Sequence, residues 1–159
     1  MTPQIEFVFN QLDDSLKKEI IDFWVGEKAL GVEQAHQRVN EIALIARGSE
    51  SKIMGVCTIR DYYFKPIGKN FWYFRTFVSK DYRQHGVAIG LLSETKRRMN
   101  EQFKAGKNPK IIGIIIKVEN PILKQNFPQA TWPRTQFHFV GTEGDSHIRI
   151  SYFEGATID

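Results

Sequence analysis

The residues between positions 83 and 88 have the types and spacing of an anion-binding loop. The segment is Arg-Gln-His-Gly-Val-Ala, and it lies between a predicted strand at 71–78 and a predicted amphipathic helix at 86–104. The first turn of a helix leaves backbone N–H groups without partners inside the helix, and the helix dipole adds about half a positive charge there. Gly86 has no Cβ and Ala88 is small, so an anion could approach the backbone closely, while Arg83 could add a charge-assisted hydrogen bond. The segment therefore predicts a cradle for a pyrophosphate.

The same segment resembles a motif of the GNAT superfamily of acyltransferases. That motif is Arg/Gln-x-x-Gly-x-Gly/Ala, here Arg83-x-x-Gly86-x-Ala88, and the resemblance extends to Val78 before the loop and to Leu91 and Leu92 in the helix. The order of predicted elements also matches: strand, two helices, three strands, helix, strand and a hairpin. The resemblance implies a mixed α/β fold with a splayed central β-sheet flanked by helices. It implies one GNAT-like domain over residues 1–159.

The co-substrate implied by the resemblance is acetyl-CoA, or another acyl-CoA, with no metal. The backbone of the strand that ends at Val78 would pair with the pantetheine arm. The pyrophosphate would contact the amides of residues 83–88, and Asn120 matches an asparagine that the family often has beside the cofactor. The cofactor contacts implied in this way are Phe77, Val78, Arg83, Gln84, His85, Gly86, Val87, Ala88 and Asn120.

The reaction implied by the resemblance is direct acyl transfer to a primary amine, with a base that deprotonates the amine and an acid that protonates the departing thiolate. After Asn120 the family usually continues as a helix with a tyrosine as the acid, whereas residues 121–128 here are Pro-Ile-Leu-Lys-Gln-Asn-Phe-Pro. Glu119, at the end of a predicted strand, is the candidate base, and Tyr73 and Tyr152 are the candidate acids. Solvation of the carboxylate and packing of the aromatic rings are the alternative roles.

Length and composition predict an ordered, single-domain protein. The chain has 159 residues with 42% hydrophobic and 25% charged residues, as is typical of soluble domains. The longest apolar run, 111–116, is too short to cross a bilayer, and residues 1–7 lack the pattern of a secretory signal. Cys57 is the only cysteine, so no intrachain disulfide can form. We therefore expect a cytoplasmic protein with no membrane partner.

Apolar spacing and turn residues predict the elements that would position the anion-binding loop. The first helix has an N-terminal cap among residues 13–15 and ends near Gly31. The long helix has a stripe of Ala88, Leu92, Thr95, Met99 and Phe103. The last hairpin turns around Gly141 and Gly144. The predicted strands cover 5–9, 42–47, 53–63, 71–78, 111–118, 137–140 and 147–153, and the predicted helices cover 13–31, 32–40 and 86–104.

The basic charge leaves more than one function open. The formal net charge is +4, and Lys80, Arg83 and residues 96–98 bracket one region, which suits a polyanionic partner. A non-catalytic acyl-CoA-binding module would explain the missing tyrosine. A basic nucleic-acid-binding α/β domain could stack bases on residues 71–74. For the acyltransferase itself we expect a small-molecule or protein amine as acceptor and no nucleic acid, and an exposed edge strand would permit a homodimer.

The remaining reactive residues predict neither a metal site nor a nucleophile. The four histidines are scattered without paired carboxylate or cysteine spacing, and Cys57 is expected to be an inert core residue. Gly86 and Gly90 also fit a second interpretation, in which they let the helix pack closely on the sheet. Residues 126–134 contain two prolines and two large aromatic residues, which predicts an ordered loop over the acceptor cleft or over the core.

Overall fold

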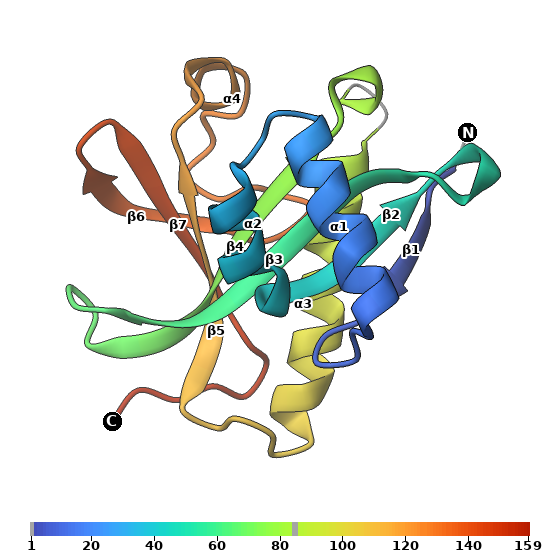
Figure 1. Ribbon diagram of the computed structural model, residues 1–159. Coiled ribbons are helices and arrows are strands. Elements are labelled where there is room, and N and C mark those ends of the chain that lie inside the picture. The colour runs from blue at the N-terminus through green and yellow to red at the C-terminus, as the bar shows by residue number, and fades with distance from the viewer. Residues whose placement is uncertain (1, 84–85) are drawn as a thin grey trace. The chain divides into compact units, whose positions relative to one another are not determined.

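A computed structural model describes residues 2–83 and 86–159, and in this part of the chain seven strands and four α-helices form a mixed α/β fold (Figure 1). The strands are β1 (Gln4–Phe7), β2 (Ile42–Arg47), β3 (Ile53–Phe64), β4 (Lys69–Val78), β5 (Ile111–Val118), β6 (His138–Glu143) and β7 (Ser146–Tyr152). The helices are α1 (Asp14–Gly26), α2 (Val32–Arg38), α3 (Val87–Lys104) and α4 (Pro121–Asn126). The fold class predicted from the sequence is confirmed.

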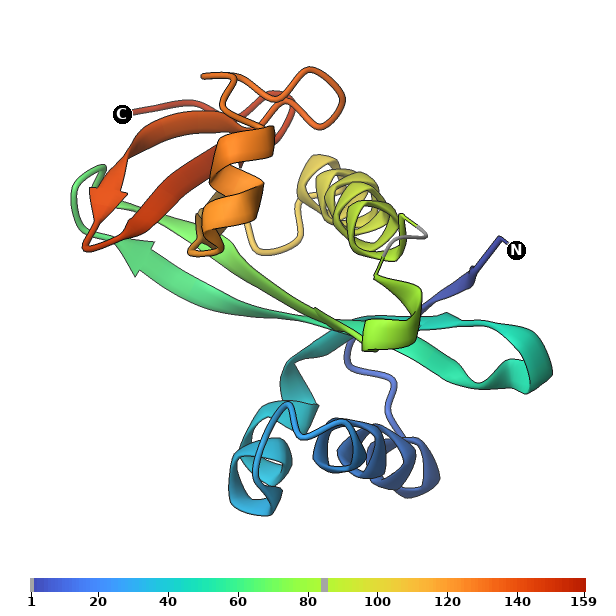
Figure 2. The same cartoon turned by 90° about the horizontal axis from the view of Figure 1, so that it is seen from above.

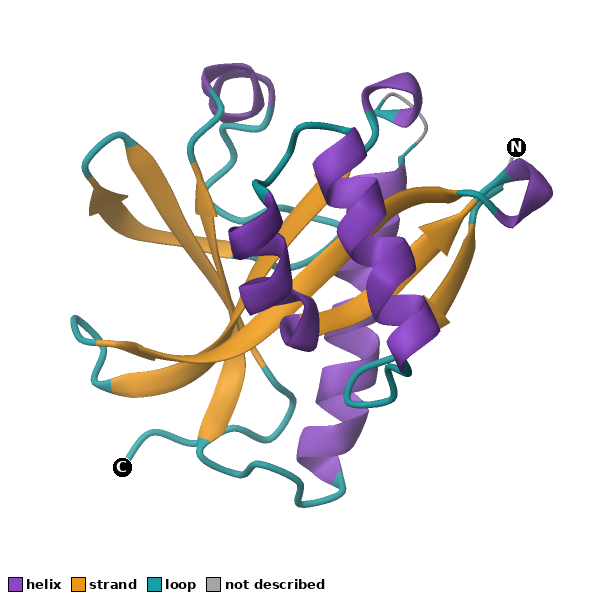
Figure 3. Cartoon of the chain, viewed as in Figure 1, coloured by secondary structure: helices purple, strands orange, loops and turns teal. Residues whose placement is uncertain are grey.

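The strands follow the order β1-β2-β3-β4-β5-β7-β6 in one sheet. The pair β4–β5 is parallel, whereas β1–β2, β2–β3, β5–β7 and β6–β7 are antiparallel. The long strands β3 and β4 follow each other across a short turn (Figure 3). The aligned pairs of β4 and β5 run from Asn70–Ile111 to Tyr73–Ile115.

The chain forms two compact units that share β3, β4 and α3. The first unit comprises residues 1–60 and 75–95, and the second comprises residues 61–74 and 96–159. The sequence resemblance implied that two strands of the sheet splay apart at their ends. Those strand ends belong to different units, so the splay stays a prediction. The prediction of one domain over residues 1–159 also stays a prediction.

In the first unit, α1 and α2 cover one face of β2 and β3, and the beginning of α3 covers the other face (Figure 2). Ile20 and Trp24 of α1 are buried against Ile45 and neighbouring apolar side chains of the strands. The helix begins where predicted, because Asp13 Oδ1 accepts a hydrogen bond of 2.8 Å from the backbone N–H of Leu16.

The predicted end of the first helix at Gly31 is wrong, because α1 ends at Gly26. The backbone N–H of Glu27 bonds to Phe23 O, and Lys28 then adopts a left-handed conformation with φ of 59°. Gly31 has extended backbone angles and precedes α2 as its N-cap. A glycine between two helices serves here as a helix start, although glycine is more typical of a helix end.

The buried stripe of α3 begins one residue earlier than predicted. Val87, Leu91, Thr95 and Met99 are buried, together with Leu92, whereas Ala88 is exposed. The buried positions repeat every four residues from Val87, as expected for the face of a helix that packs on a sheet.

In the second unit, β5 is the central strand between β4 and β7, and residues 111–116 are all buried as predicted. Gly113 lies opposite Tyr152, so closely that a Cβ on Gly113 would be 2.4 Å from Ser151 O. The helix α4 was not predicted. It begins at Asn120, whose Oδ1 accepts a 2.8 Å hydrogen bond from the backbone N–H of Ile122, and Pro121 occupies its first turn.

The last hairpin is β6–β7, but only one of its two predicted turn glycines lies in the turn. Gly144 lies between the strands, whereas Gly141 belongs to β6, at a shift of the register with β7. Within residues 2–83 and 86–159, no helix is long and apolar enough to cross a membrane.

Candidate functional site

The predicted anion-binding segment connects β4 to α3 in the first unit. The backbone N–H of Ser79 bonds to Met54 O at 2.8 Å, which ties the end of β4 to β3. A short 3-10 turn over Lys80–Tyr82 follows, and α3 begins at Val87. The predicted succession of strand, basic loop and helix is therefore confirmed. Gln84 and His85, which the sequence analysis assigned to the cofactor, lie outside the described residues.

Gly86 has the backbone conformation that a tight entry into α3 requires. Its φ of 71° lies in the left-handed region, which favours glycine. Gly86 O accepts a 3.0 Å hydrogen bond from the backbone N–H of Gly90, so the amides of residues 87–89 form the first helical turn. A first turn has no acceptors for these amides within the helix. Val87 is buried, whereas Ala88 and Ile89 are exposed, so the exposed side of this helix start carries one small side chain beside a larger apolar one.

Gly55 of β3 also shapes this region, and the sequence analysis did not single it out. A Cβ on Gly55 would be 3.2 Å from Phe77 O and equally close to side-chain atoms of Val78 and Val87. The glycine thus lets the end of β4 and the start of α3 pack directly on β3. The available signal was a lone glycine inside an apolar strand, which often marks a close backbone approach.

Arg83 folds back onto the end of β4. Its Nε donates a 3.1 Å hydrogen bond to Val78 O, and its guanidinium carbon lies 5.6 Å from the centre of the Phe77 ring. Three of the residues predicted to bind the cofactor, Phe77, Val78 and Arg83, are therefore in mutual contact within the first unit. The carbonyl oxygen of Val78 and the ring of Phe77 hold the guanidinium of Arg83 in place.

The basic residues of α3 do not gather at its start. Lys96 Nζ donates to Thr135 O at 2.6 Å, and burial lowers the pKa of Lys96. Arg97 pairs with Glu101 one turn further along, with 2.8 Å between Nη1 and Oε1. At 1.5 Å per residue, residues 96–98 lie about 14–17 Å beyond the first residue of the helix. Of the cations expected to bracket the site, Lys80 and Arg83 remain in the loop before α3.

The candidate catalytic residues Glu119, Tyr73 and Tyr152 belong to the second unit, but Glu119 and Tyr152 lie at opposite ends of β5. Glu119 is exposed just after the end of β5, whereas Tyr152 lies opposite Gly113 near its beginning. Six residues of strand separate these two positions, or about 20 Å. Glu119 and Tyr152 therefore cannot both contact one reacting group. Asn120 uses its side-chain carbonyl to cap α4.

Tyr73 lies beside a partly buried cation, Lys117, that was not assigned to a site from the sequence. Lys117 Nζ is 5.4 Å from the Tyr73 ring centre and 4.9 Å from that of Tyr62, and it is 3.1 Å from Glu143 Oε1. Burial lowers the pKa of Lys117, but hydrogen bonds with Tyr62 and Glu143 outweigh that effect and leave the pKa above its usual value. The ammonium is therefore charged at neutral pH.

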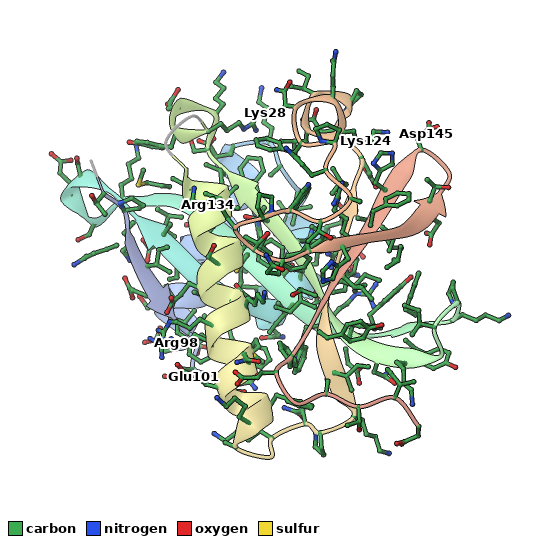
Figure 4. The ribbon with its side chains drawn as sticks, turned by 180° about the vertical axis from the view of Figure 1, so that it is seen from behind. Lys28, Arg98, Glu101, Lys124, Arg134 and Asp145 are labelled. Atoms are coloured by element: carbon green, nitrogen blue, oxygen red, sulfur yellow. The ribbon has the colours of Figure 1, made fainter. Side chains whose placement is uncertain are left out.

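The ordered loop predicted at 126–134 is anchored within the second unit. Trp132 Nε1 donates to Phe127 O at 3.0 Å, and the guanidinium carbon of Arg149 lies 4.4 Å from the centre of the Trp132 ring. Lys124 of α4 donates to the backbone oxygen of Asp145 at the β6–β7 turn, and Figure 4 shows these two residues side by side. Whether the loop also borders an acceptor site stays a prediction.

The aromatic run at 71–74 does not form a stacking surface. Phe71, Trp72 and Phe74 are all buried, with at most 8% of their surface exposed. Stacking on nucleic-acid bases requires exposed ring faces. Of the two observations that favoured a nucleic-acid-binding domain, the aromatic run is therefore removed and the basic charge remains. Among the residues that the structure describes, no group of three or more His, Cys, Asp or Glu side chains is placed to hold a metal ion.

Cys57 is an inert core residue, as predicted. Its side chain is fully buried in β3, its Sγ lies 3.4 Å from Thr95 Oγ1, and burial raises the pKa of the thiol to about 12. We expect a disulfide reagent at pH 8 to label the folded protein at least about 100-fold more slowly than the unfolded protein. Ellman's reagent with and without denaturant measures both rates. Rapid stoichiometric labelling of the folded protein would contradict the burial.

No protein-family model matches the sequence, and no curated protein matches it either. Solved structures do. A GNAT-family acetyltransferase from Streptococcus pneumoniae is similar over 96% of this chain and 100% of that one, with a TM-score of 0.64 and 12% identity. NAA60 of Arabidopsis thaliana, in complex with acetyl-CoA, is similar over 97% of this chain and 100% of that one, with a TM-score of 0.59 and 16% identity.

A third similar structure is a mutant of the toxin AtaT bound to acetyl-CoA and to the C-terminus of the antitoxin AtaR. The similarity covers 95% of this chain and 93% of that one, with a TM-score of 0.58 and 15% identity. Because these similarities span almost the whole chain, the protein has the fold of the GNAT superfamily, as the sequence resemblance implied. The first of these structures is a GNAT-family acetyltransferase, and the other two contain acetyl-CoA.

Proposed function

We propose that the protein is an N-acyltransferase of the GNAT type, which moves an acetyl or other acyl group from acyl-CoA to a primary amine. The observation that carries this proposal is the start of α3. In a chain with the GNAT fold, Gly86 in a left-handed conformation directly precedes an 18-residue helix that follows β4 and a short basic loop. A fixed helix start with an exposed small residue suits a diphosphate.

The proposed binding site for the coenzyme uses the chain from Phe77 to Ala88. The amides of residues 86–88 and the positive end of the helix dipole would hold the pyrophosphate. The guanidinium of Arg83 would exchange its neutral acceptor, Val78 O, for a phosphate oxygen, which forms the stronger hydrogen bond. The backbone of Phe77 and Val78 would align the pantetheine arm. Gln84, His85 and Asn120 complete the proposed set.

The proposed reaction forms a C–N bond and breaks the C–S bond of the thioester. The amine nitrogen attacks the thioester carbonyl carbon, its proton passes to a base, and the departing thiolate receives a proton from an acid. Glu119 is the proposed base. Tyr73 is the proposed acid, because Tyr152 lies at the opposite end of β5 from Glu119.

The test begins with the binding of acetyl-CoA. At a concentration 100 times its Kd, a ligand stabilises the folded state by about 2.7 kcal/mol, which for a protein of this size raises Tm by about 5–10 °C. Differential scanning fluorimetry measures this shift. Release of free coenzyme A in the presence of a panel of amines then measures transfer. Failure of acetyl-CoA to shift Tm would contradict the proposal.

A second candidate function is a non-catalytic acyl-CoA-binding module. It is favoured by one observation: Pro121–Asn126, which forms α4 directly after Asn120, contains no tyrosine. Such a module would show the same thermal shift but would release no coenzyme A with any amine. The acceptor is proposed to be a small-molecule or protein amine. AtaT binds an antitoxin, so a protein with this fold can have a protein partner.

A further inference from the structure

The central strand β5 includes one charged residue in an otherwise apolar sequence. Residues 111–118 are Ile-Ile-Gly-Ile-Ile-Ile-Lys-Val, and the side chain of Lys117 is only 16% exposed. Taking an ammonium group out of water costs free energy, and an apolar residue at this position would avoid that cost. The position of Lys117 therefore needs a compensating interaction or a function.

The neighbours of Lys117 come from four other strands of the second unit. Tyr73 of β4 is aligned with Ile115, two residues before Lys117 on the same face of β5, and Tyr62 of β3 lies beside it. On the other side, Lys117 lies opposite Ile148 of β7, which in turn lies opposite Gly141 of β6.

The side chain of Lys117 reaches across β7 to Glu143. Its Nζ lies 3.1 Å from Glu143 Oε1 on β6, and Ile148 of β7 is aligned with both Lys117 and Gly141 of β6. The result is a cluster in which one ammonium group has two aromatic rings and one carboxylate around it.

Glu143 is an exposed partner for Lys117, although its hydrogen bond and that of Tyr62 keep the ammonium charged. The side chain of Glu143 is 58% exposed and lies beside the β6–β7 turn. An ion pair with a partner so exposed to water adds little to stability. The cluster therefore suits binding better than stabilisation. The side chain of Lys117 is mostly buried beside two aromatic rings, whereas its partner Glu143 is exposed enough for water to replace its carboxylate.

We propose that Lys117, Tyr62 and Tyr73 form a receptor for a carboxylate or phosphate group of the acyl acceptor, and that Glu143 occupies this receptor in the free protein. The ammonium donates charge-assisted hydrogen bonds that suit an oxyanion, and the two tyrosine rings flank it. A simple cationic amine would be repelled by Lys117. The acceptor class is therefore an amine that also carries an anionic group.

This inference rests on the proposed acyltransferase function, because Tyr73 is also the proposed acid. The experiment compares matched amines that differ in the anionic group: β-alanine with propylamine, and phosphoethanolamine with ethanolamine. With acetyl-CoA, we expect the anionic member of each pair to have a kcat/KM at least about tenfold higher. Lys117→Met should remove this preference, and Glu143→Gln should lower KM for the anionic member alone.

A surface cation supplies the matched control. Lys104 of α3 pairs with Glu154 at 3.4 Å, and both side chains are more than half exposed. Lys104→Met removes the same charge from the second unit and should leave both members of each pair unchanged. Equal or better use of the neutral amines by the wild type would overturn the proposal, and so would an equal loss for both members in Lys117→Met.

Saturation-transfer NMR provides a readout that does not depend on turnover. The anionic probes should bind to the wild type and more tightly to Glu143→Gln, and Lys117→Met should bind neither probe while keeping its thermal shift with acetyl-CoA.

If Lys117→Met does not fold, Lys117→Arg and Glu143→Gln still test the receptor. Binding of anionic probes without any thermal shift by acetyl-CoA would refute the acyltransferase but support the receptor. Absence of anionic-probe binding to both wild type and Glu143→Gln would refute the receptor.

Discussion

Replacement of Gly86 by leucine is expected to raise the Kd for acetyl-CoA by about 30- to 150-fold, which corresponds to about 2–3 kcal/mol of lost binding free energy. The φ of 71° at Gly86 is unfavourable for leucine by about 1–2 kcal/mol, so the entry into α3 would rearrange. The new side chain would also occupy the approach to the first-turn amides. Isothermal titration calorimetry measures the Kd.

Gly106→Leu is the matched control for this variant. Gly106 follows α3 with a φ of 83°, and a Cβ there would meet no heavy atom within 4 Å. The substitution imposes the same kind of backbone strain at the other end of the same helix, so it should lower Tm to a similar degree while leaving the Kd unchanged. If Gly86→Leu binds acetyl-CoA as tightly as the control, the start of α3 is not the binding site.

Gly113→Ala is expected to have the largest effect on stability. Its Cβ would lie 2.4 Å from Ser151 O and 3.0 Å from Tyr152 Cα, and these are backbone atoms of β7 that cannot rotate away. Forcing β5 and β7 apart should cost about 3 kcal/mol, or about 6–12 °C in Tm. Thermal unfolding followed by circular dichroism measures the change.

Gly26→Ala separates this clash from the general effect of replacing a glycine. Gly26 is the last residue of α1, and a Cβ there would meet no heavy atom within 4 Å. Alanine has a higher helix propensity than glycine, so Tm should stay the same or rise slightly. A Tm for Gly113→Ala within about 2 °C of the wild type would show that β5 and β7 do not pair in this register.

Helix boundaries show which parts of the fold the local sequence determines. The start of α1 was predictable because its cap joins Asp13 to an amide only three residues away. Its end was not, because it depends on Lys28 in a left-handed conformation that lysine seldom adopts. The helix α4 has six residues, too few for apolar periodicity to reveal, although Asn120 and Pro121 are typical of a helix start.

The two candidate sites also differ in how far the local sequence determines them. The segment from β4 to α3 is continuous in sequence, so the pattern of a strand, a glycine and an amphipathic helix was enough to predict it. The cluster around Lys117 joins four strands, and their adjacency follows from the order β3-β4-β5-β7-β6. Hydrophobic periodicity identifies strands but does not determine which strands become neighbours. Lys117 was therefore visible in the sequence only as an exception in an apolar strand.

The strands β3 and β4 and the helix α3 each have residues in both units, and this division affects how the chain can fold during its synthesis. Residues 61–74 of the second unit leave the ribosome before residues 75–95, which the first unit needs for completion. The first unit must therefore wait until residue 95 has emerged, and the second must wait for β7, which ends at Tyr152. No single truncation yields either unit without residues of the other. A fragment that stops at residue 60 would expose the apolar face that α3 covers in the native protein.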